Sequence, residues 1–493
     1  MNNGLKSKLA YGSGDIYGGA AFLIFSLLYM NFLVLVEGID VVAASSIIFI
    51  GKIWDAVTDP FVGSLSDNTR SRYGRRRIYF LIGLAPVFLS FVMLFYSFGI
   101  SGETAKIIYH MFAYMFFGTA FTIVMVPYNA ILSDITANYN ERTGFTTVRM
   151  IVSAGAALVA AVVPSIIIKT VGGETNGPAQ KNGYLIMAVV FGLIFAACWL
   201  ITFLGTKERK DFPPTEKFSF KKWISVLKNK SFRIYLGAFL SFQIAIDLIL
   251  ALFIFYIDIV ILKYKSYELI IGTLLVCSLL FMALQGQLAK KKGKNFPLII
   301  GMPIWILAAF VFIFITTETP VFVLLILAAL IAIGSSAGNL STWSMITDIF
   351  DVDELMTGQR REGVYSGFTT FVRKMASGIA ILLLGVGLKA MGFNQVEYNI
   401  LKNSMDNFDP AVYASSNIVQ GIRLMFVIIP IVLLIVTFVF AIKYKVNNKR
   451  FDTIIKGIEL LKSGEKLEGL TDEEKADLVI CTGKPIDKLW GKE

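Results

Sequence analysis

Two aspartates, Asp55 and Asp59, stand one helical turn apart in an apolar stretch that reads Trp-Asp-Ala-Val-Thr-Asp-Pro. Residues at this spacing share one face of a helix. An acidic side chain at the centre of a bilayer costs about 2.5–3.5 kcal/mol on insertion scales, so the pair must face a wet cavity or a cation. Pro60 removes a backbone donor and frees the carbonyl of Ala56 as a further oxygen ligand. The pattern favours a site for a hard monovalent cation, such as Na⁺, over a pair neutralised by a basic residue of a neighbouring helix.

Further polar side chains interrupt other apolar stretches and are candidates for binding a solute. They are Asp15, Thr122, Asn129, Arg149, Gln243, Asp247 and Lys374. With a cytoplasmic N-terminus, Asp15, Asn129, Arg149 and Trp343 fall in the inner half of the membrane and Asp55, Thr122 and Lys374 near its middle, and a central cavity between two halves of a helical bundle would gather them. For Arg149 and Lys374 the alternative to a binding role is structural pairing with Asp15, Asp55 or Asp59, and with these charges close together pairing and function can coexist. Tyr128 and Trp343 either pack within the bundle or offer a pyranose ring an apolar face on which to stack.

The sequence contains none of the residue patterns that are typical of enzyme active sites. His110 is the only histidine, and no Ser-His-Asp arrangement, Walker loop or HExxH sequence occurs. The three cysteines, Cys198, Cys277 and Cys481, are far apart and predict neither a disulfide framework nor a zinc site. A membrane-bound enzyme or sensor would need a catalytic cluster or a large appended domain. We therefore expect no enzyme and no cofactor other than a coupling cation.

The elements that must position these residues are transmembrane helices. Of the 493 residues 56% are hydrophobic and 16% charged, and the mean hydropathy is +0.68, which indicates a chain solvated by lipid. Apolar stretches long enough to cross a bilayer recur along the chain. The predicted spans are 9–36, 41–67, 78–98, 104–135, 143–171, 182–205, 231–262, 267–289, 297–317, 319–349, 362–391 and 419–445.

The formal charge of +11 reflects membrane orientation rather than nucleic-acid binding. Arginines crowd the loop at 70–77 and lysines the loop at 290–294, whereas 37–40 and 316–320 carry neither. Basic loops stay in the cytoplasm, so both termini are predicted to be cytoplasmic. The first apolar stretch lacks a cleavage pattern for a signal peptide and should remain as the first helix.

The polar stretch around Pro213 and Pro214 separates six predicted spans from six. We therefore divide the chain into an N-terminal six-helix half (1–205), a cytoplasmic linker (206–230), a C-terminal six-helix half (231–445) and a cytoplasmic helical tail (446–493). In the tail, Thr471 and Glu474 fit a capping box for a helix that Gly483 would end. A solvated tail lying on the bundle is favoured over a regulatory module.

The segment from Lys52 to Leu81, which joins the aspartate pair to Ser-Asp-Asn-Thr-Arg-Ser-Arg-Tyr-Gly-Arg-Arg-Arg, resembles the glycoside-pentoside-hexuronide:cation symporters, the melibiose-carrier-like family of the major facilitator superfamily. Supporting matches are Tyr11 to Asp15, Val126 to Tyr128, Glu141-Arg142, Trp343 to Gly363 and Phe371 to Lys374. The resemblance implies an all-α major facilitator fold of twelve transmembrane helices in two six-helix halves. It also implies alternating access and uptake driven by Na⁺, Li⁺ or H⁺.

By this resemblance, the cation site comprises Asp55, Thr58, Asp59 and Thr122. The residues expected to contact or couple the solute are Asp15, Tyr128, Asn129, Arg149, Trp343 and Lys374. The melibiose carrier has a Lys-Asp pair where Gly18 and Gly19 stand and a sugar-binding Asp near Met125, so the resemblance does not imply galactoside recognition. The implied protein is a monomer in the bacterial cytoplasmic (inner) membrane with a small glycoside-like substrate and no nucleic acid. The alternative is the same fold moving a lysolipid or another amphiphile.

Overall fold

The computed structural model describes residues 4–135, 139–173, 177–208, 224–359, 361–393, 416–465 and 467–490. Helices form all the regular structure of these segments, and no strand occurs in them. The first set of helices comprises α1 (Leu5–Asn31), η1 (Phe32–Val36), α2 (Val41–Asn68), α3 (Ile78–Ile82), α4 (Leu84–Leu94), α5 (Glu103–Ile135), α6 (Tyr139–Gly172), η2 (Pro178–Gln180) and α7 (Lys181–Gly205).

A second set follows a short η3 (Ser225–Lys228). It comprises α9 (Lys230–Phe255), η4 (Tyr256–Val260), η5 (Tyr264–Ser266), α10 (Tyr267–Lys292), α11 (Phe296–Val311), η6 (Phe312–Phe314), α12 (Val321–Thr357), α13 (Glu362–Ala390) and α16 (Asn417–Lys443). The chain then forms α17 (Asn448–Lys462), η8 (Leu467–Gly469), α18 (Asp472–Thr482) and η9 (Ile486–Lys488).

Eleven helices of the described residues are long and apolar enough to cross a membrane, and Leu84–Leu94 is a shorter apolar helix. The shorter helix lies where a continuous span at 78–98 was predicted. There the chain forms α3 and α4 in succession, with Gly83 between them. A Cβ on Gly83 would lie 2.1 Å from Cγ1 of Val124. The close approach of α5 therefore requires glycine at this junction.

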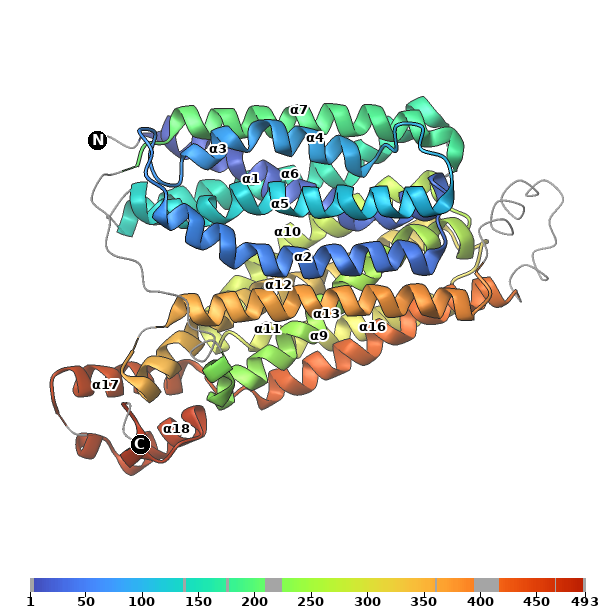
Figure 1. The fold of residues 1–493 in the computed structure, drawn as a ribbon. Helices are drawn as coiled ribbons and strands as arrows, with labels where there is room; N and C mark the ends of the chain where they lie inside the picture. The colour runs from blue at the N-terminus through green and yellow to red at the C-terminus, as the bar shows by residue number, and fades with distance from the viewer. Residues whose placement is uncertain are drawn as a thin grey trace.

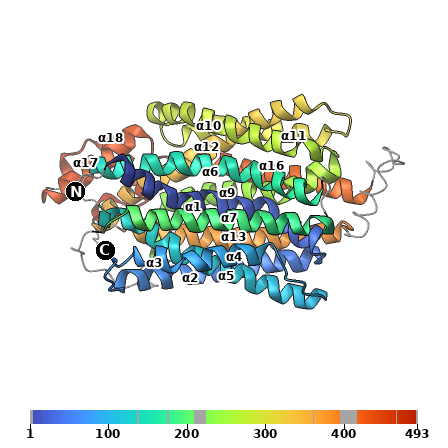
Figure 2. The same cartoon turned by 90° about the horizontal axis from the view of Figure 1, so that it is seen from above.

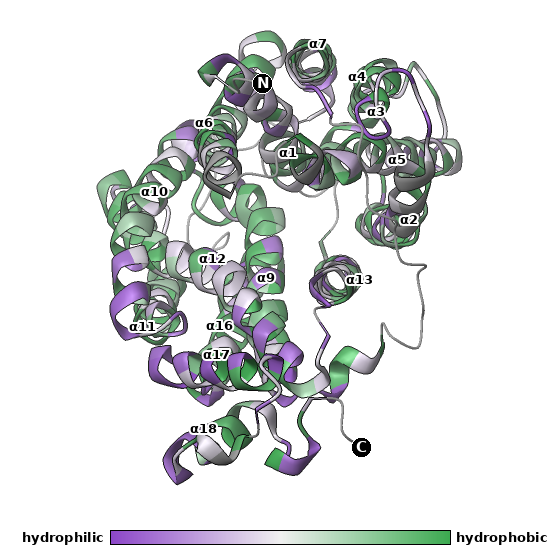
Figure 3. Ribbon diagram, turned by 90° about the vertical axis from the view of Figure 1, so that its left-hand side faces the viewer, coloured by the Kyte–Doolittle hydropathy of each residue, from purple (hydrophilic) through white to green (hydrophobic). Residues whose placement is uncertain are grey.

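The long helices run side by side along one axis (Figures 1 and 2). The N-terminal end of α1 and the tail helices α17 and α18 lie at the same end of the bundle (Figure 1). We call this the terminal end, and the other the opposite end. Viewed from the terminal end, α1 to α7 and α9 to α16 form two groups, and α13 lies beside α2 and α9 (Figure 3).

The two groups meet through matching pairs of helices. α1 packs against α9, α2 against α13, and α6 against α10. The first helix of each group also ends in the same way, because α1 continues into η1 and α9 into η4, both one turn of π-helix and both fully buried. π-Helical turns of this kind are rare, so their recurrence at equivalent places relates the two groups to each other.

Ion pairs join the two groups at the opposite end. Lys169 of α6 lies 2.7 Å from Glu268 of α10, whose carboxylate also accepts a hydrogen bond from Ser165 at 2.8 Å. Lys389 of α13 lies 2.9 Å from Asp40, the residue that caps α2. In this conformation the groups are therefore held together at the opposite end.

The tail packs on the terminal end of the second group. Ile454, Ile458 and Leu478 are buried in one cluster with Leu355 of α12, and Lys462 lies 2.7 Å from Glu354. The capping box predicted at Thr471 and Glu474 is present, and Gly483 ends α18 in a left-handed conformation with φ 70°. Because the apolar faces of α17 and α18 lie against the bundle, the tail helices are part of the folded core.

Candidate functional site

The two aspartates of α2 face a lysine of α13. Nζ of Lys374 lies 3.0 Å from Oδ2 of Asp55 and 2.6 Å from Oδ2 of Asp59. Thr122 of α5 donates a hydrogen bond of 2.8 Å to Oδ1 of Asp59. This group, which we call the aspartate cluster, joins helices of both groups. Its lysine is the neighbouring basic residue that the sequence analysis held as the alternative to a cation.

One oxygen of the aspartate cluster has no hydrogen-bond partner in the described part of the chain. It is Oδ1 of Asp55, a residue only 1% exposed. Gly118 of α5 leaves room beside it, since a Cβ there would lie 2.7 Å from this oxygen. The hydroxyl of Thr58 instead donates to the backbone carbonyl of Asp55 at 3.2 Å. A buried, unsatisfied carboxylate oxygen next to a second carboxylate and a hydroxyl is a donor set that fits a small hard cation.

A second charged group, the Asp247 cluster, lies between α2, α9 and α13. Asp247 accepts a hydrogen bond from Ser377 and lies 3.7 Å from Nζ of Lys52 and 3.8 Å from Nη2 of Arg373. Lys52 also donates to Ser377, and Arg373 donates to Oε1 of Gln243 at 3.2 Å. Gln243 and Asp247 were predicted from the sequence as intramembrane polar groups, whereas Lys52, Arg373 and Ser377 were not. Two of them could have been identified from the sequence, because Arg373 directly precedes Lys374 and Lys52 lies about one helical turn before Asp55.

The third group, the Arg149 cluster, lies within the first set of helices. Nε and Nη2 of Arg149 each lie 3.1 Å from an oxygen of Asp15. Nη2 also donates to Asn129 at 2.8 Å. The structure therefore brings together Asp15 of α1, Asn129 of α5 and Arg149 of α6, as the sequence analysis expected for an internal site.

The two aromatic candidates have different surroundings. Tyr128 is fully buried: its ring stacks on Tyr11 at 4.7 Å, and the guanidinium of Arg149 lies over it at 4.8 Å. Because the ring is buried against these two side chains, Tyr128 offers no stacking surface in this conformation, and its contact with a solute stays a prediction. Trp343 is 52% exposed and meets Phe239 edge-on at 5.5 Å, which leaves its indole accessible.

Helix α5 connects the aspartate cluster to the Arg149 cluster. Thr122 belongs to the first and Asn129 to the second, two helical turns apart and on the same face. At 1.5 Å per residue this separation is about 10 Å, a distance that a small solute and a cation could share. The arrangement can hold a cation among oxygens and, next to it, bind hydroxyl or acidic groups through Arg149 and Asn129.

Gly18 and Gly19 both lie in tightly packed surroundings. A Cβ on Gly18 would lie 2.6 Å from Oδ1 of Asp15 and 2.7 Å from Cε of Met125. A Cβ on Gly19 would lie 2.6 Å from Oγ of Ser153. The backbone oxygen of Ser153 lies 2.8 Å from the same Cβ, so a larger side chain at 19 would collide with α6, whereas one at 18 would displace the side chains of Asp15 and Met125.

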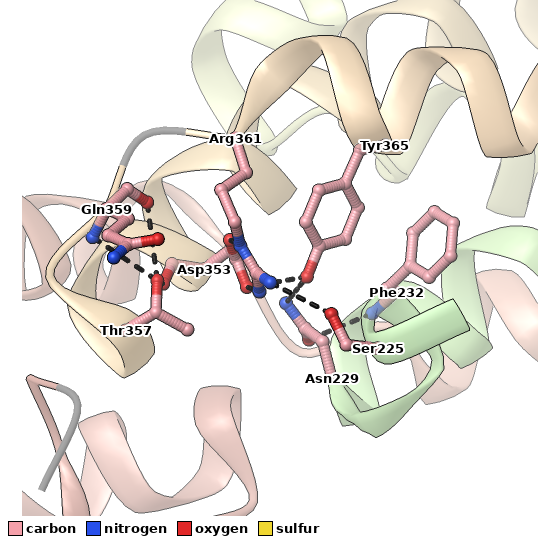
Figure 4. A network of polar contacts seen from close by, with 8 residues as sticks. All are labelled: Ser225, Asn229, Phe232, Asp353, Thr357, Gln359, Arg361 and Tyr365. Carbon is pink, nitrogen blue, oxygen red and sulfur yellow. Dashed lines mark hydrogen bonds and ion pairs between the residues drawn. The ribbon is translucent and has the colours of Figure 1, made fainter. Parts of the chain in front are cut away.

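A fourth polar group stabilises the terminal end of the second set (Figure 4). Arg361 makes a bidentate pair with Asp353, at 2.8 Å from Nε and 2.6 Å from Nη2, and donates to Ser225 at 2.9 Å. Tyr365 donates to Asp353 at 2.6 Å and accepts from Asn229 at 3.4 Å. The hydrogen bonds to Asp353 raise the pKa of Arg361. This group joins the end of α12 to the starts of α9 and α13.

Comparisons with known proteins agree with this architecture. The model of a family described as MFS/sugar transport protein matches residues 10–448. An uncharacterized symporter, YjmB of Bacillus subtilis, is 27% identical, with 92% of this chain and 95% of that protein covered. A putative glycoside/cation symporter, YagG of Escherichia coli, is 26% identical, covering 91% and 94%.

A sodium-dependent lysophosphatidylcholine symporter, 1-A of Danio rerio, is 24% identical, covering 91% of this chain and 87% of that protein. Among solved structures, an inward-facing bacterial homologue of the human lysosomal transporter Spinster superimposes with a TM-score of 0.61 at 13% identity, covering 92% of this chain and 97% of that one. At this identity the likeness concerns the fold alone, and it confirms the predicted all-α major facilitator architecture.

Proposed function

Because the chain belongs to the MFS/sugar transport protein family, whose members are multi-pass membrane transporters and not enzymes, we propose that it is a cation-coupled symporter of a glycoside, pentoside or hexuronide. The coupling ion is Na⁺, Li⁺ or H⁺. The transporter works as a monomer in the bacterial cytoplasmic membrane, and its terminal end faces the cytoplasm because the basic loops lie at that end. It uses no other cofactor.

The observation that carries this proposal is the aspartate cluster. Lys374 of the second helix set holds Asp55 and Asp59 of the first, so the cluster is also a link between the two sets. Two close carboxylates in low dielectric need a positive partner. A coupling cation bound by Asp55, Asp59, Thr58 and Thr122 would take the place of the ammonium and loosen this link.

The solute would bind beside the cation. Arg149, Asn129 and Asp15 offer charged donors and acceptors for hydroxyl groups, Tyr128 positions Arg149, and Trp343 offers an accessible ring for a sugar face. Cation and solute together would allow one set of helices to rock against the other around the fixed site. The opposite end, closed by ion pairs in this conformation, would open in the other state.

An alternative cargo is a lysolipid or another amphiphile, because a lysophosphatidylcholine symporter is among the relatives. Competition for cation-dependent uptake separates the two cargo classes. A glycoside that competes and a lysolipid that does not would support the sugar transporter. The reverse result would make the amphiphile the substrate and leave the cation site unchanged.

The test of the coupling mechanism is removal of one negative charge. Asp55→Asn or Asp59→Cys should abolish accumulation against a gradient and leave solute binding that no longer responds to sodium or to pH. Solute affinity is measured on purified protein with and without sodium at two pH values, together with counterflow in vesicles. If the variants still concentrate solute with unchanged cation dependence, the two aspartates are structural, and the proposed coupling through the aspartate cluster is wrong.

A further inference from the structure

Arg373 is a cation near the middle of α13 whose charge is only partly neutralised by the described residues. Its Nε donates to Gln243 at 3.2 Å, and its Nη2 approaches Asp247 no closer than 3.8 Å. Asp247 is shared with Lys52, at 3.7 Å, and with the hydroxyl of Ser377. One carboxylate therefore serves two cations. Within the described part of the chain, the other N–H groups of Arg373 have no acceptor.

The side chain of Arg373 must face water. It lies about 17 Å along α13 from Glu362, at 1.5 Å per residue, which is close to mid-membrane. Even so, 35% of the side chain is exposed. An arginine turned to lipid at this depth would be very costly. Its guanidinium contacts Gln243 and Asp247, both on α9, so the exposed part of the side chain faces a polar space inside the bundle.

The ring of Trp343 meets α9 one helical turn from Gln243, the residue to which Arg373 donates. Trp343 contacts Phe239 at 5.5 Å between ring centroids, and Phe239 is one helical turn before Gln243 on the same face of α9. The second helix set therefore presents a guanidinium, an amide and an exposed indole on neighbouring positions. Such a combination suits a sugar ring that carries an acidic substituent.

The charge balance of the site favours the same cargo. The three clusters contain the cations Lys52, Arg149, Arg373 and Lys374 and the carboxylates of Asp15, Asp55, Asp59 and Asp247. With all of these groups ionised, the charges cancel. One added metal cation leaves one excess positive charge in a low-dielectric interior, and a solute with one negative charge would remove it.

We propose that Arg373 and Gln243 form a subsite for an acidic group of the solute, a carboxylate or a sulfonate, so that the preferred cargo is an anionic glycoside. This inference rests on the proposed function of the chain as a glycoside symporter. The guanidinium would bind two oxygens of the acidic group side by side, and the amide of Gln243 would add a donor. The solute would then lie between this subsite and the Arg149 cluster.

The test compares solutes that differ only in the acidic group. Affinities of the full-length purified protein are measured in sodium for 4-nitrophenyl β-glucuronide, 4-nitrophenyl 6-deoxy-6-sulfo-β-glucoside and 4-nitrophenyl β-glucoside. The wild type should bind at least one acidic glycoside about tenfold or more tighter than the neutral one, as charge-assisted hydrogen bonds require. Comparison of the affinities for the glucuronide and the sulfoglucoside shows whether the subsite prefers a carboxylate or a sulfonate.

Variants then assign the preference to the subsite. Arg373→Gln should bring the ratio of acidic to neutral affinity to about one, and Arg373→Lys should keep part of it because lysine retains the charge without the paired donors. Gln243→Glu supplies a carboxylate from the protein itself and should also abolish the preference. Arg233→Gln is the control, because this exposed arginine of α9 bonds the carbonyl of Leu227 at 3.0 Å, away from the site.

Two results are decisive against the inference. A wild type that binds the neutral glycoside as tightly as both acidic ones, or an unchanged preference in Arg373→Gln and Gln243→Glu, overturns the acidic subsite while glycoside binding stands. If the wild type binds none of the three compounds, the proposed glycoside function is wrong, and this inference falls with it.

Discussion

Replacement of Lys374 by glutamine is the most direct test of the aspartate cluster. The ammonium lies 3.0 Å from Asp55 and 2.6 Å from Asp59. At an effective dielectric constant of about 20, these two contacts correspond to attractions of about 5.5 and about 6.4 kcal/mol. Desolvation of the buried ions removes several kcal/mol of this sum. The remainder still makes the ammonium a strong competitor for any cation that uses the same oxygens.

We therefore expect Lys374→Gln to bind the coupling cation more tightly and to transport poorly. A net advantage of about 1.4 kcal/mol for the ammonium corresponds to a tenfold gain in cation affinity when it is removed. The cation binds more tightly because it no longer competes with the ammonium for the two carboxylates. Transport is poor because the contact between α2 and α13 through Lys374 is already absent, so cation binding can no longer loosen it. Sodium and lithium affinities are measured by calorimetry on purified protein, with potassium as the reference ion.

The matched control for this prediction is Lys389→Gln. Lys389 is on the same helix but pairs with Asp40 at the opposite end, at 2.9 Å. Its loss should leave the cation affinity unchanged. If folded Lys374→Gln binds sodium no more tightly than the wild type does, the ammonium does not compete with the cation, and the reasoning from these two contacts is refuted.

Three further predictions concern other parts of the molecule. Arg149→Gln should abolish solute binding measured by calorimetry, and Arg149→Lys should restore only part of it, because lysine cannot reproduce the paired contacts to Asp15; normal binding by both variants would exclude this arginine from the site. Each of the single variants Lys169→Glu and Glu268→Lys should slow counterflow, because it breaks the ion pair that closes the opposite end. The double charge swap should restore the rate. If the double variant is as slow as either single variant, this ion pair does not hold the opposite end closed. Burial raises the pKa of the Cys481 thiol to about 11, so with the other cysteines replaced by serine it should resist maleimide at neutral pH; labelling as fast as that of a free thiol would show that the tail is not docked.

Much of the architecture follows from sequence alone. The helix positions were predicted to within a few residues, because the thickness of the bilayer sets the length of the apolar stretch that a spanning helix needs. The chief error was the unbroken span predicted at 78–98. The helix is interrupted at Gly83, where α5 packs so closely that a Cβ on residue 83 would lie 2.1 Å from the side chain of Val124. Helix α12 also continues to Thr357 instead of ending at 349. The hydropathy of the sequence predicts neither the break at Gly83 nor the extension of α12, because each depends on packing against another helix.

The residue types of the candidate site were predicted from the sequence, and Asp15, Asp55 and Asp59 were named as possible partners of Arg149 and Lys374 without deciding which carboxylate pairs with which cation. Asp55 and Asp59 were readable because their spacing fixes one helical face, and the cost of burying charge requires a partner. Which cation partners them depends on the packing of α13 against α2, which brings in Lys374 from a distant part of the chain. The Asp247 cluster was largely missed for the same reason, because Lys52, Asp247 and Arg373 are on three different helices.

The sequence by itself thus determined a lipid-solvated helical bundle, the order of its helices and the charged residues that lie inside it. These properties depend on local composition and on the spacing along one helix. The tertiary structure alone decided that Lys374 lies between the two aspartates, that Tyr128 is buried against Tyr11 and Arg149, and that the side chain of Arg373 stays partly exposed. The physical reason is that charge pairing in a low-dielectric interior depends on distances of a few ångströms between helices, and those distances are set by side-chain packing along the whole bundle.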